Sequence, residues 1–81
     1  MEFSIKEVKE KTRLALLSDE RIKDLYVDLY TKIFISASDG NYAIHCENQN
    51  IDELDKIITL FKIDGFTVET PLSPIITISW R

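Results

Sequence analysis

The distribution of hydrophobic residues along the chain predicts three amphipathic helices. The clearest signal spans residues 19–38, where hydrophobic side chains recur at steps of three and four, the spacing that places them on one side of a helix. These residues are Ile22, Leu25, Tyr26, Leu29, Tyr30, Ile33, Phe34 and Ala37. A second helix is expected over 51–63, with a stripe formed by Ile51, Leu54, Ile57, Ile58 and Phe61. The third, over 5–17, has a narrower stripe, formed by Ile5, Val8, Thr12, Ala15 and Leu16.

Two of these helices begin with a capping motif. Ser4 is followed three residues later by Glu7, and Asn50 is followed in the same way by Glu53. At this spacing the two side chains accept hydrogen bonds from backbone N–H groups that have no partner within the first turn. Each cap contributes about 1 kcal/mol, which is enough to define where the helix starts.

The pattern leaves one helix boundary open. Ser18 or Asp19, followed by acidic residues, resembles the start of a new helix. However, a seven-residue hydrophobic spacing continues from Val8 across this point to Leu29. Residues 5–38 therefore form either one bent helix or two.

Alternation of hydrophobic and polar residues predicts three β-strands, over 42–47, 66–70 and 75–80. In the last strand Ile76, Ile78 and Trp80 share one side. This predicts that the final residues of the chain lie in a sheet, with one side on the core.

The order of these elements, α(α)βαββ, predicts a single α+β domain over residues 1–81. The helix over 51–63 would connect two parallel strands, 42–47 and 66–70. The last strand would return antiparallel, either at an edge or between them, and the bulk of Ile75 favours the middle position. The expected fold is a two-layer sandwich with a three-stranded mixed sheet and with the helices packed on one face.

The strand residues that point away from the helices are mostly polar and form a candidate site. The candidate face for a ligand or a protein partner consists of His45, Thr67, Glu69, Thr77 and Ser79, with Tyr26 and Tyr30 from the helix over 19–38. For the two tyrosines we favour packing in the core, and the alternative is an exposed aromatic ridge.

Charge and composition narrow the class of protein. The formal net charge is −4, and residues 24–81 hold four Lys and Arg against nine Asp and Glu. Because an acidic surface repels phosphate groups, a nucleic-acid partner is not expected. The single cysteine, Cys46, cannot form an internal disulfide. The sequence also shows no signal peptide and no membrane-spanning stretch, so a cytoplasmic protein is expected.

Residues that could carry catalysis are few and separated. His45 is the single histidine, and Cys46 beside it would point to the opposite side of the strand, so the two cannot act as a base and a nucleophile together. The sequence contains no phosphate-binding glycine loop, no zinc-protease motif and no serine-hydrolase motif. We therefore expect no catalytic residue, no metal and no cofactor.

The N-terminal helix, within residues 1–18, is a candidate for self-association. Three helices compete for one face of a three-stranded sheet, and the broader stripes of 19–38 and 51–63 should occupy it. The remaining helix would then pair with a second copy of the chain, most simply about a two-fold axis. The predicted interface consists of Ile5, Val8, Ala15 and Leu16.

Turn and core residues in the region 22–81 follow a particular order. A long helix leads to a glycine turn, a strand, a helix that ends in Gly-Phe, and a final Ile-Ser-Trp strand. The residues are Ala37, Gly40, Ile44, Gly65, Phe66, Val68, Ile78, Ser79 and Trp80. This order resembles a class of small bacteriophage-encoded proteins. The resemblance implies a cytoplasmic accessory protein of a phage, and it assigns no catalytic residue.

Three functional hypotheses follow. The first is a non-catalytic binding protein that occludes a host protein, as a host-takeover or anti-defence protein does. The second is an oligomer that sequesters a small nucleotide-type signal, with basic residues of helix 5–17 on phosphate and tyrosine rings on the base. The third is a minor structural component of the virion.

Overall fold

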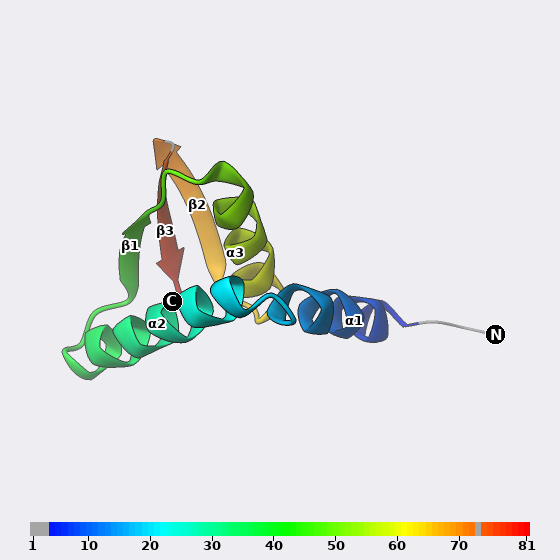
Figure 1. Cartoon of the computed structure of the whole chain (residues 1–81). Coiled ribbons are helices and arrows are strands. Elements are labelled where there is room, and N and C mark those ends of the chain that lie inside the picture. Colours follow the sequence, from blue (N-terminus) through cyan, green and yellow to red (C-terminus); the bar gives the residue numbers. More distant parts are fainter. Residues whose placement is uncertain (1–3, 73) are drawn as a thin grey trace.

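The computed structural model describes residues 4–72 and 74–81, and six elements follow one another in this part of the chain (Figure 1). They are the helices α1 (Ile5–Leu17) and α2 (Glu20–Ser38), the strand β1 (Ala43–Glu47), the helix α3 (Ile51–Ile63), and the strands β2 (Thr67–Leu72) and β3 (Ile75–Ser79). This content confirms the predicted α+β class.

Side-chain caps define the starts of α1 and α3. The Ser4 hydroxyl oxygen accepts a hydrogen bond from the Glu7 backbone N–H at 3.1 Å. The Asn50 side-chain oxygen accepts one from the Glu53 backbone N–H at 3.2 Å. Both caps lie where the sequence predicts them, and both residues have extended backbone angles that keep them outside the helix.

The boundary that the sequence leaves open is a break between two helices. α1 ends at Leu17, and the Asp19 carboxylate then accepts a hydrogen bond from the Arg21 backbone N–H at 3.0 Å, which caps α2. Asp19 itself has extended backbone angles. The hydrophobic spacing therefore continues across a point at which the helix axis changes.

The three strands form one antiparallel sheet in the order β1-β3-β2. β1 and β2 run in the same direction but do not pair, because β3 lies between them. The prediction of a mixed sheet is therefore wrong, whereas the middle position of β3 is confirmed. Ile78 of β3 is paired with Ile44 on one side and with Val68 on the other, so hydrophobic residues align across all three strands.

The edge strand β2 contains an irregularity. Its pairing with β3 is regular from Thr67 to Glu69 and resumes with Leu72 opposite Ile75. Pro71 lies in the interrupted stretch. Proline has no N–H to donate to a neighbouring strand, and for this reason it is tolerated at sheet edges and bulges.

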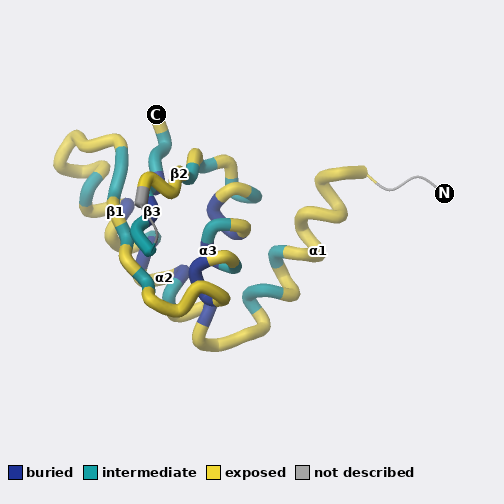
Figure 2. The backbone as a smooth tube through the Cα atoms, turned by 90° about the horizontal axis from the view of Figure 1, so that it is seen from above, coloured by how far each residue is buried: buried dark blue, intermediate teal, exposed yellow. Residues whose placement is uncertain are grey.

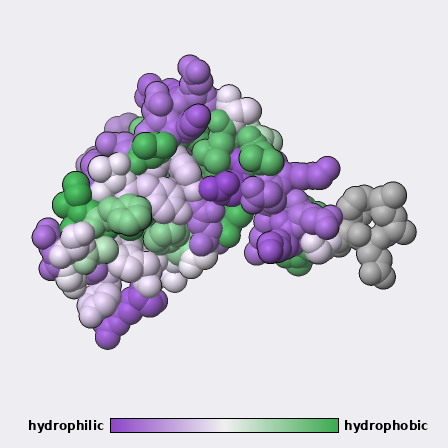
Figure 3. Space-filling model, turned by 90° about the horizontal axis from the view of Figure 1, so that it is seen from below, coloured by the Kyte–Doolittle hydropathy of each residue, from purple (hydrophilic) through white to green (hydrophobic). Residues whose placement is uncertain are grey.

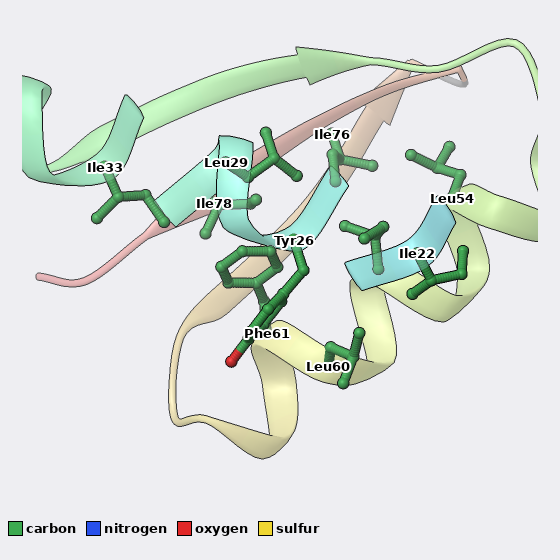
Figure 4. Close-up of a cluster of buried hydrophobic side chains, with 10 residues drawn as sticks. Ile22, Tyr26, Leu29, Ile33, Leu54, Leu60, Phe61, Ile76 and Ile78 are labelled. Atoms are coloured by element: carbon green, nitrogen blue, oxygen red, sulfur yellow. The ribbon is translucent and has the colours of Figure 1, made fainter. Parts of the chain in front are cut away.

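The hydrophobic core lies between the sheet and the helices α2 and α3 (Figures 1 and 4). Its buried members come from α2, α3 and β3, and the least exposed are Leu60, Phe61, Ile76 and Ile78, at 0 %. Ile76 and Ile78 are the central-strand residues that the sequence places on the core side. The strand β3 thus contributes the sheet's fully buried side chains to the core.

Three positions in the predicted stripes of α2 and α3 are not in the core. Phe34 is 71 % exposed, Ile51 is 51 % exposed, and Ala37 is exposed too. The buried line of α2 runs through Tyr26, Leu29 and Ile33, and Phe34 lies about 100° further round the helix than Ile33. The core covers only a narrow arc of α2, so the wider stripe remains in solvent.

The helix α1 projects from the rest of the molecule (Figures 1 and 2). No residue of α1 is buried, and Ile5 and Val8 are 73 % and 54 % exposed. Leu16 and Leu17, at its C-terminal end, pack against the core. The helix is therefore attached at one end.

Candidate functional site

The outer side of the sheet brings together five of the candidate residues. His45, Thr77 and Glu69 lie in one row across the three strands, because Thr77 is paired with both of the others. Ser79 and Thr67 are paired in the next row. We call these five residues the polar sheet face. His45, Thr67 and Glu69 are exposed, whereas the two residues of the central strand are half-buried.

A hydrogen bond orders the polar sheet face. His45 Nδ1 and Thr77 Oγ1 lie 2.9 Å apart. The central strand beneath is fully buried on its other side, through Ile76 and Ile78. The face is therefore polar and open, and its central strand is anchored in the core by Ile76 and Ile78.

Tyr26 and Tyr30 do not belong to this face. Tyr26 is 7 % exposed and Tyr30 is half-buried, and both rings pack against Phe61 on the core side of the sheet, with centroid distances of 5.2 and 5.1 Å. The favoured interpretation, packing in the core, is correct. The alternative of an exposed aromatic ridge is wrong, because the polar ends of these rings meet a carboxylate inside the molecule.

This carboxylate is Asp64, which follows α3. Tyr30 donates its hydroxyl proton to Asp64 Oδ2 at 2.7 Å, and Tyr26 donates to the same oxygen. Arg13 Nε donates to Asp64 Oδ1 at 2.9 Å, and Arg13 Nη2 donates to the Tyr26 hydroxyl at 3.1 Å. We call these four residues the Asp64 cluster. The cluster ties α1 to both α2 and α3.

Electrostatics keep the Asp64 cluster in one protonation state. Burial alone would raise the pKa of Asp64, but hydrogen bonds from Tyr26, Tyr30 and Arg13 outweigh it and hold the pKa below its ordinary value. Burial, followed by the hydrogen bond to Asp64, raises the pKa of both tyrosine phenols. None of these groups exchanges a proton near neutral pH, so the cluster has the properties of a structural joint and not of an acid–base catalyst.

His45 and Cys46 lie on opposite sides of β1. His45 is on the polar sheet face, while Cys46 is half-buried and packs against the core. Burial raises the pKa of the Cys46 thiol, which lowers the fraction of reactive thiolate. No group of three or more His, Cys, Asp or Glu residues that could hold a metal ion occurs within 4–72 and 74–81.

A first cleft, of about 270 Å³, lies between α2, β1 and the start of α3. Its floor is hydrophobic and includes Leu25 and Ile57. Its two cations are already paired, Arg21 with Glu53 and Lys32 with Asp28 at 3.3 Å. The cleft is therefore a hydrophobic hollow whose two cations are already paired, and Glu47 adds a carboxylate to its lining.

A second cleft, of about 340 Å³, lies between α1 and the end of α3. Lys6 and Lys9 line it and would attract an anion, but Glu10 and Asp64 line it too. The carbonyl end of α3 adds a partial negative charge at the same place. These charges work against the binding of phosphate, and hence against the nucleotide hypothesis.

Most of the strongly exposed hydrophobic side chains lie on helices, and one, Tyr42 at 57 %, lies between α2 and β1. On α1 they are Ile5, Val8 and Leu14, and on the outer side of α2 they are Val27, Phe34 and Ile35, all 54–73 % exposed. Seen from below, hydrophobic and weakly polar side chains gather over the α2 side of the molecule, whereas α1 is mostly hydrophilic (Figure 3). Sequence reasoning missed the α2 patch because it assigned Phe34 to the core.

Comparisons of the chain with protein-family models, with curated proteins and with solved structures find no match. In the part of the chain that the structure describes, no helix is both long and hydrophobic enough to cross a membrane.

Proposed function

We propose that the chain is a non-catalytic, self-associating binding protein that uses the polar sheet face to cover a surface of another protein. The observation that carries the proposal is the uncovered outer side of the sheet. His45, Thr67 and Glu69 are exposed there, on strands whose other side is packed into the core.

The shape and chemistry of this face suit a protein partner. It is a pleated surface with alternating hydroxyl, imidazole and carboxylate groups, and neither cleft lies on it. Protein interfaces are crossed by about one hydrogen bond per 100–200 Å², which such polar groups can supply, and the backbone usually moves little on binding. A small ligand, by contrast, usually requires a concave site that encloses most of its surface.

The resemblance to small phage proteins supports a specific setting. In that setting the protein is an accessory protein in the host bacterial cytoplasm, where it occludes a host protein as a host-takeover or anti-defence factor. Sequestration of a small nucleotide is the second candidate. We rank it lower, because Glu10 and Asp64 oppose an anion beside Lys6 and Lys9. A role as a minor virion component is the third.

The proposal is tested by capture from host lysate with three forms of the protein. Thr67→Arg adds a long cation to the polar sheet face, and Thr59→Arg makes the same change at an exposed position of α3. We expect the unmodified protein and Thr59→Arg to capture the same host protein, and Thr67→Arg to lose it while it remains folded. Equal capture by all three forms would exclude this face. Release of a nucleotide on denaturation of the purified protein would favour the second candidate.

A further inference from the structure

The helix α1 carries an exposed hydrophobic seam along one side. Ile5, Val8, Thr12 and Ala15 follow one another at steps of three, four and three, which is the spacing of a helix that packs along another helix. All four are exposed. The Thr12 hydroxyl donates a hydrogen bond to the Val8 carbonyl oxygen at 3.2 Å, so its methyl group can meet a hydrophobic partner without loss of a polar contact. We call these four residues the α1 seam.

The outer side of α2 carries a second stripe of similar construction. Val27, Thr31, Phe34 and Ser38 follow one another at steps of four, three and four. The Thr31 and Ser38 hydroxyls donate to the carbonyl oxygens of Val27 and Phe34, at 3.0 and 2.9 Å. With the adjacent Ile35, these residues form what we call the α2 stripe. Its polar groups, like those of the α1 seam, are satisfied within the helix.

The two stripes match in length. At a rise of about 1.5 Å per residue, the α1 seam extends over about 15 Å and the α2 stripe over about 17 Å. One can therefore lie along the other over its whole length, and each would cover the hydrophobic side chains that the other exposes. Neither stripe has a partner of this kind among residues 4–72 and 74–81 of its own chain.

The segments that carry the two stripes differ in net charge. Four basic and two acidic side chains give residues 5–17 a net charge of +2, whereas three basic and five acidic side chains give residues 19–39 a net charge of −2. Pairing of two α1 seams would bring Lys9 and Lys11, which flank the seam, close to those of the second copy. Pairing of α1 with α2 brings opposite charges together. In addition, Leu16 already packs against its own core and is not available to a symmetrical α1 pair.

We propose that the α1 seam of one copy packs along the α2 stripe of a second copy. A stable interface between proteins buries at least about 1,200 Å² in total, which is more than one seam of three helical turns covers. A two-fold arrangement, in which each copy both donates its α1 and receives the α1 of its partner, doubles the contact and closes the assembly as a dimer. This inference rests on the self-association in the proposed function and names the two surfaces that meet.

Two substitutions at exposed positions separate this dimer from its alternatives. Val8→Asp disrupts the α1 seam and Phe34→Asp disrupts the α2 stripe, and neither residue is part of the core. We expect each variant alone to dimerise roughly 100-fold more weakly than the unmodified protein. In the dimer, the new carboxylate would be buried between the helices, away from water and without a partner. Leu14→Asp is the matched control. Leu14 is 59 % exposed but lies on the other side of α1, so this variant should remain a dimer.

The decisive measurement is sedimentation velocity on an equimolar mixture of Val8→Asp and Phe34→Asp. The mixture contains one intact α1 seam and one intact α2 stripe on different chains, so a heterodimer should form. We expect it to be at least tenfold tighter than either variant alone, since a single native seam is restored.

Three outcomes would overturn the proposal. A dimer of Phe34→Asp alone would indicate pairing between two α1 helices, and a dimer of Val8→Asp alone would indicate pairing between two α2 helices. A monomer of the unmodified protein at high micromolar concentration would exclude self-association altogether. That last result would leave the proposed host binding intact, because capture through Thr67 and its neighbours is measured separately.

Discussion

The helices α1 and α3 have the same length and the same kind of N-terminal cap, but they differ in how far they are buried. Each has 13 residues, and each is capped by a side chain three residues before a glutamate. Yet α1 buries none of its residues, whereas α3 buries Glu53, Leu54, Ile57, Leu60 and Phe61. The cap decides where a helix begins, while the width of its hydrophobic side decides whether the helix enters the core.

The largest expected effect comes from the core side of α3. Phe61→Ala removes a ring that is 0 % exposed and that contacts Tyr26, Tyr30 and Phe66. We expect a loss of about 3–5 kcal/mol in the free energy of unfolding, because the cavity cannot collapse beneath the sheet. Urea unfolding followed by circular dichroism measures this. A loss below about 1 kcal/mol would show that α3 is no more essential than α1.

The Asp64 cluster, which joins the two helices, should give the next largest effect. Asp64→Asn keeps the shape but removes the charge that Arg13 and the two tyrosines contact. A loss of about 1–3 kcal/mol at neutral pH is expected, since three hydrogen bonds to a mostly buried carboxylate are weakened.

The same substitution has a pH signature. The pKa of Asp64 is lower in the folded chain than its ordinary value of 3.8. Its contribution to stability is therefore complete above that value and is lost as the pH falls through the lower, folded-state pKa. We expect the unmodified protein to lose stability on the acid side more steeply than Asp64→Asn. The measurement is the melting temperature of both proteins as a function of pH. An equal fall in the two melting temperatures at acid pH would argue against this role of Asp64.

The matched caps allow a direct test of the comparison. Asn50→Ala should lower the free energy of unfolding by about 1 kcal/mol, because α3 cannot fray without opening the core. Ser4→Ala should lower helix content slightly and leave global stability within about 0.5 kcal/mol, because α1 can fray alone. Equal effects in chemical denaturation would mean that α1 and α3 unfold as one unit.

The smallest effect is expected on the free side of α1. Val8→Ala, at a position that is 54 % exposed, should change the stability of the monomer by less than about 0.5 kcal/mol. Thermal unfolding at low protein concentration measures this without a contribution from self-association. A larger loss there would place α1 inside the cooperative core.

The local features of the fold could be predicted from sequence, because their causes are local. The caps at Ser4 and Asn50 depend on residues three positions apart, and the buried side of β3 follows from the alternation of Ile76 and Ile78. The five residues of the polar sheet face could be grouped for the same reason. Their rows across the sheet then follow once β3 is placed in the middle.

The Asp64 cluster could not be predicted in this way. Arg13 and Asp64 are 51 positions apart in the chain, and nothing in the residues next to Asp64 indicates an arginine from another helix. A weak signal was present in the two tyrosines, since hydroxyl groups carried into a core need a hydrogen-bond partner. The predicted burial of Phe34 was wrong for a different reason. Its spacing fits a wide stripe, but the sheet has only enough surface to cover part of that stripe.

The proline in the edge strand sets a limit on how copies of this chain can assemble. A β-sheet can recruit further strands through the N–H and C=O groups along its free edge, and repeated recruitment produces fibres. Pro71 has no N–H to offer, and the irregular stretch between Glu69 and Leu72 interrupts the regular spacing that an incoming strand would need. Growth of the sheet along the β2 edge is therefore disfavoured. An accumulating pool of this protein should therefore not extend into filaments through this edge of the sheet.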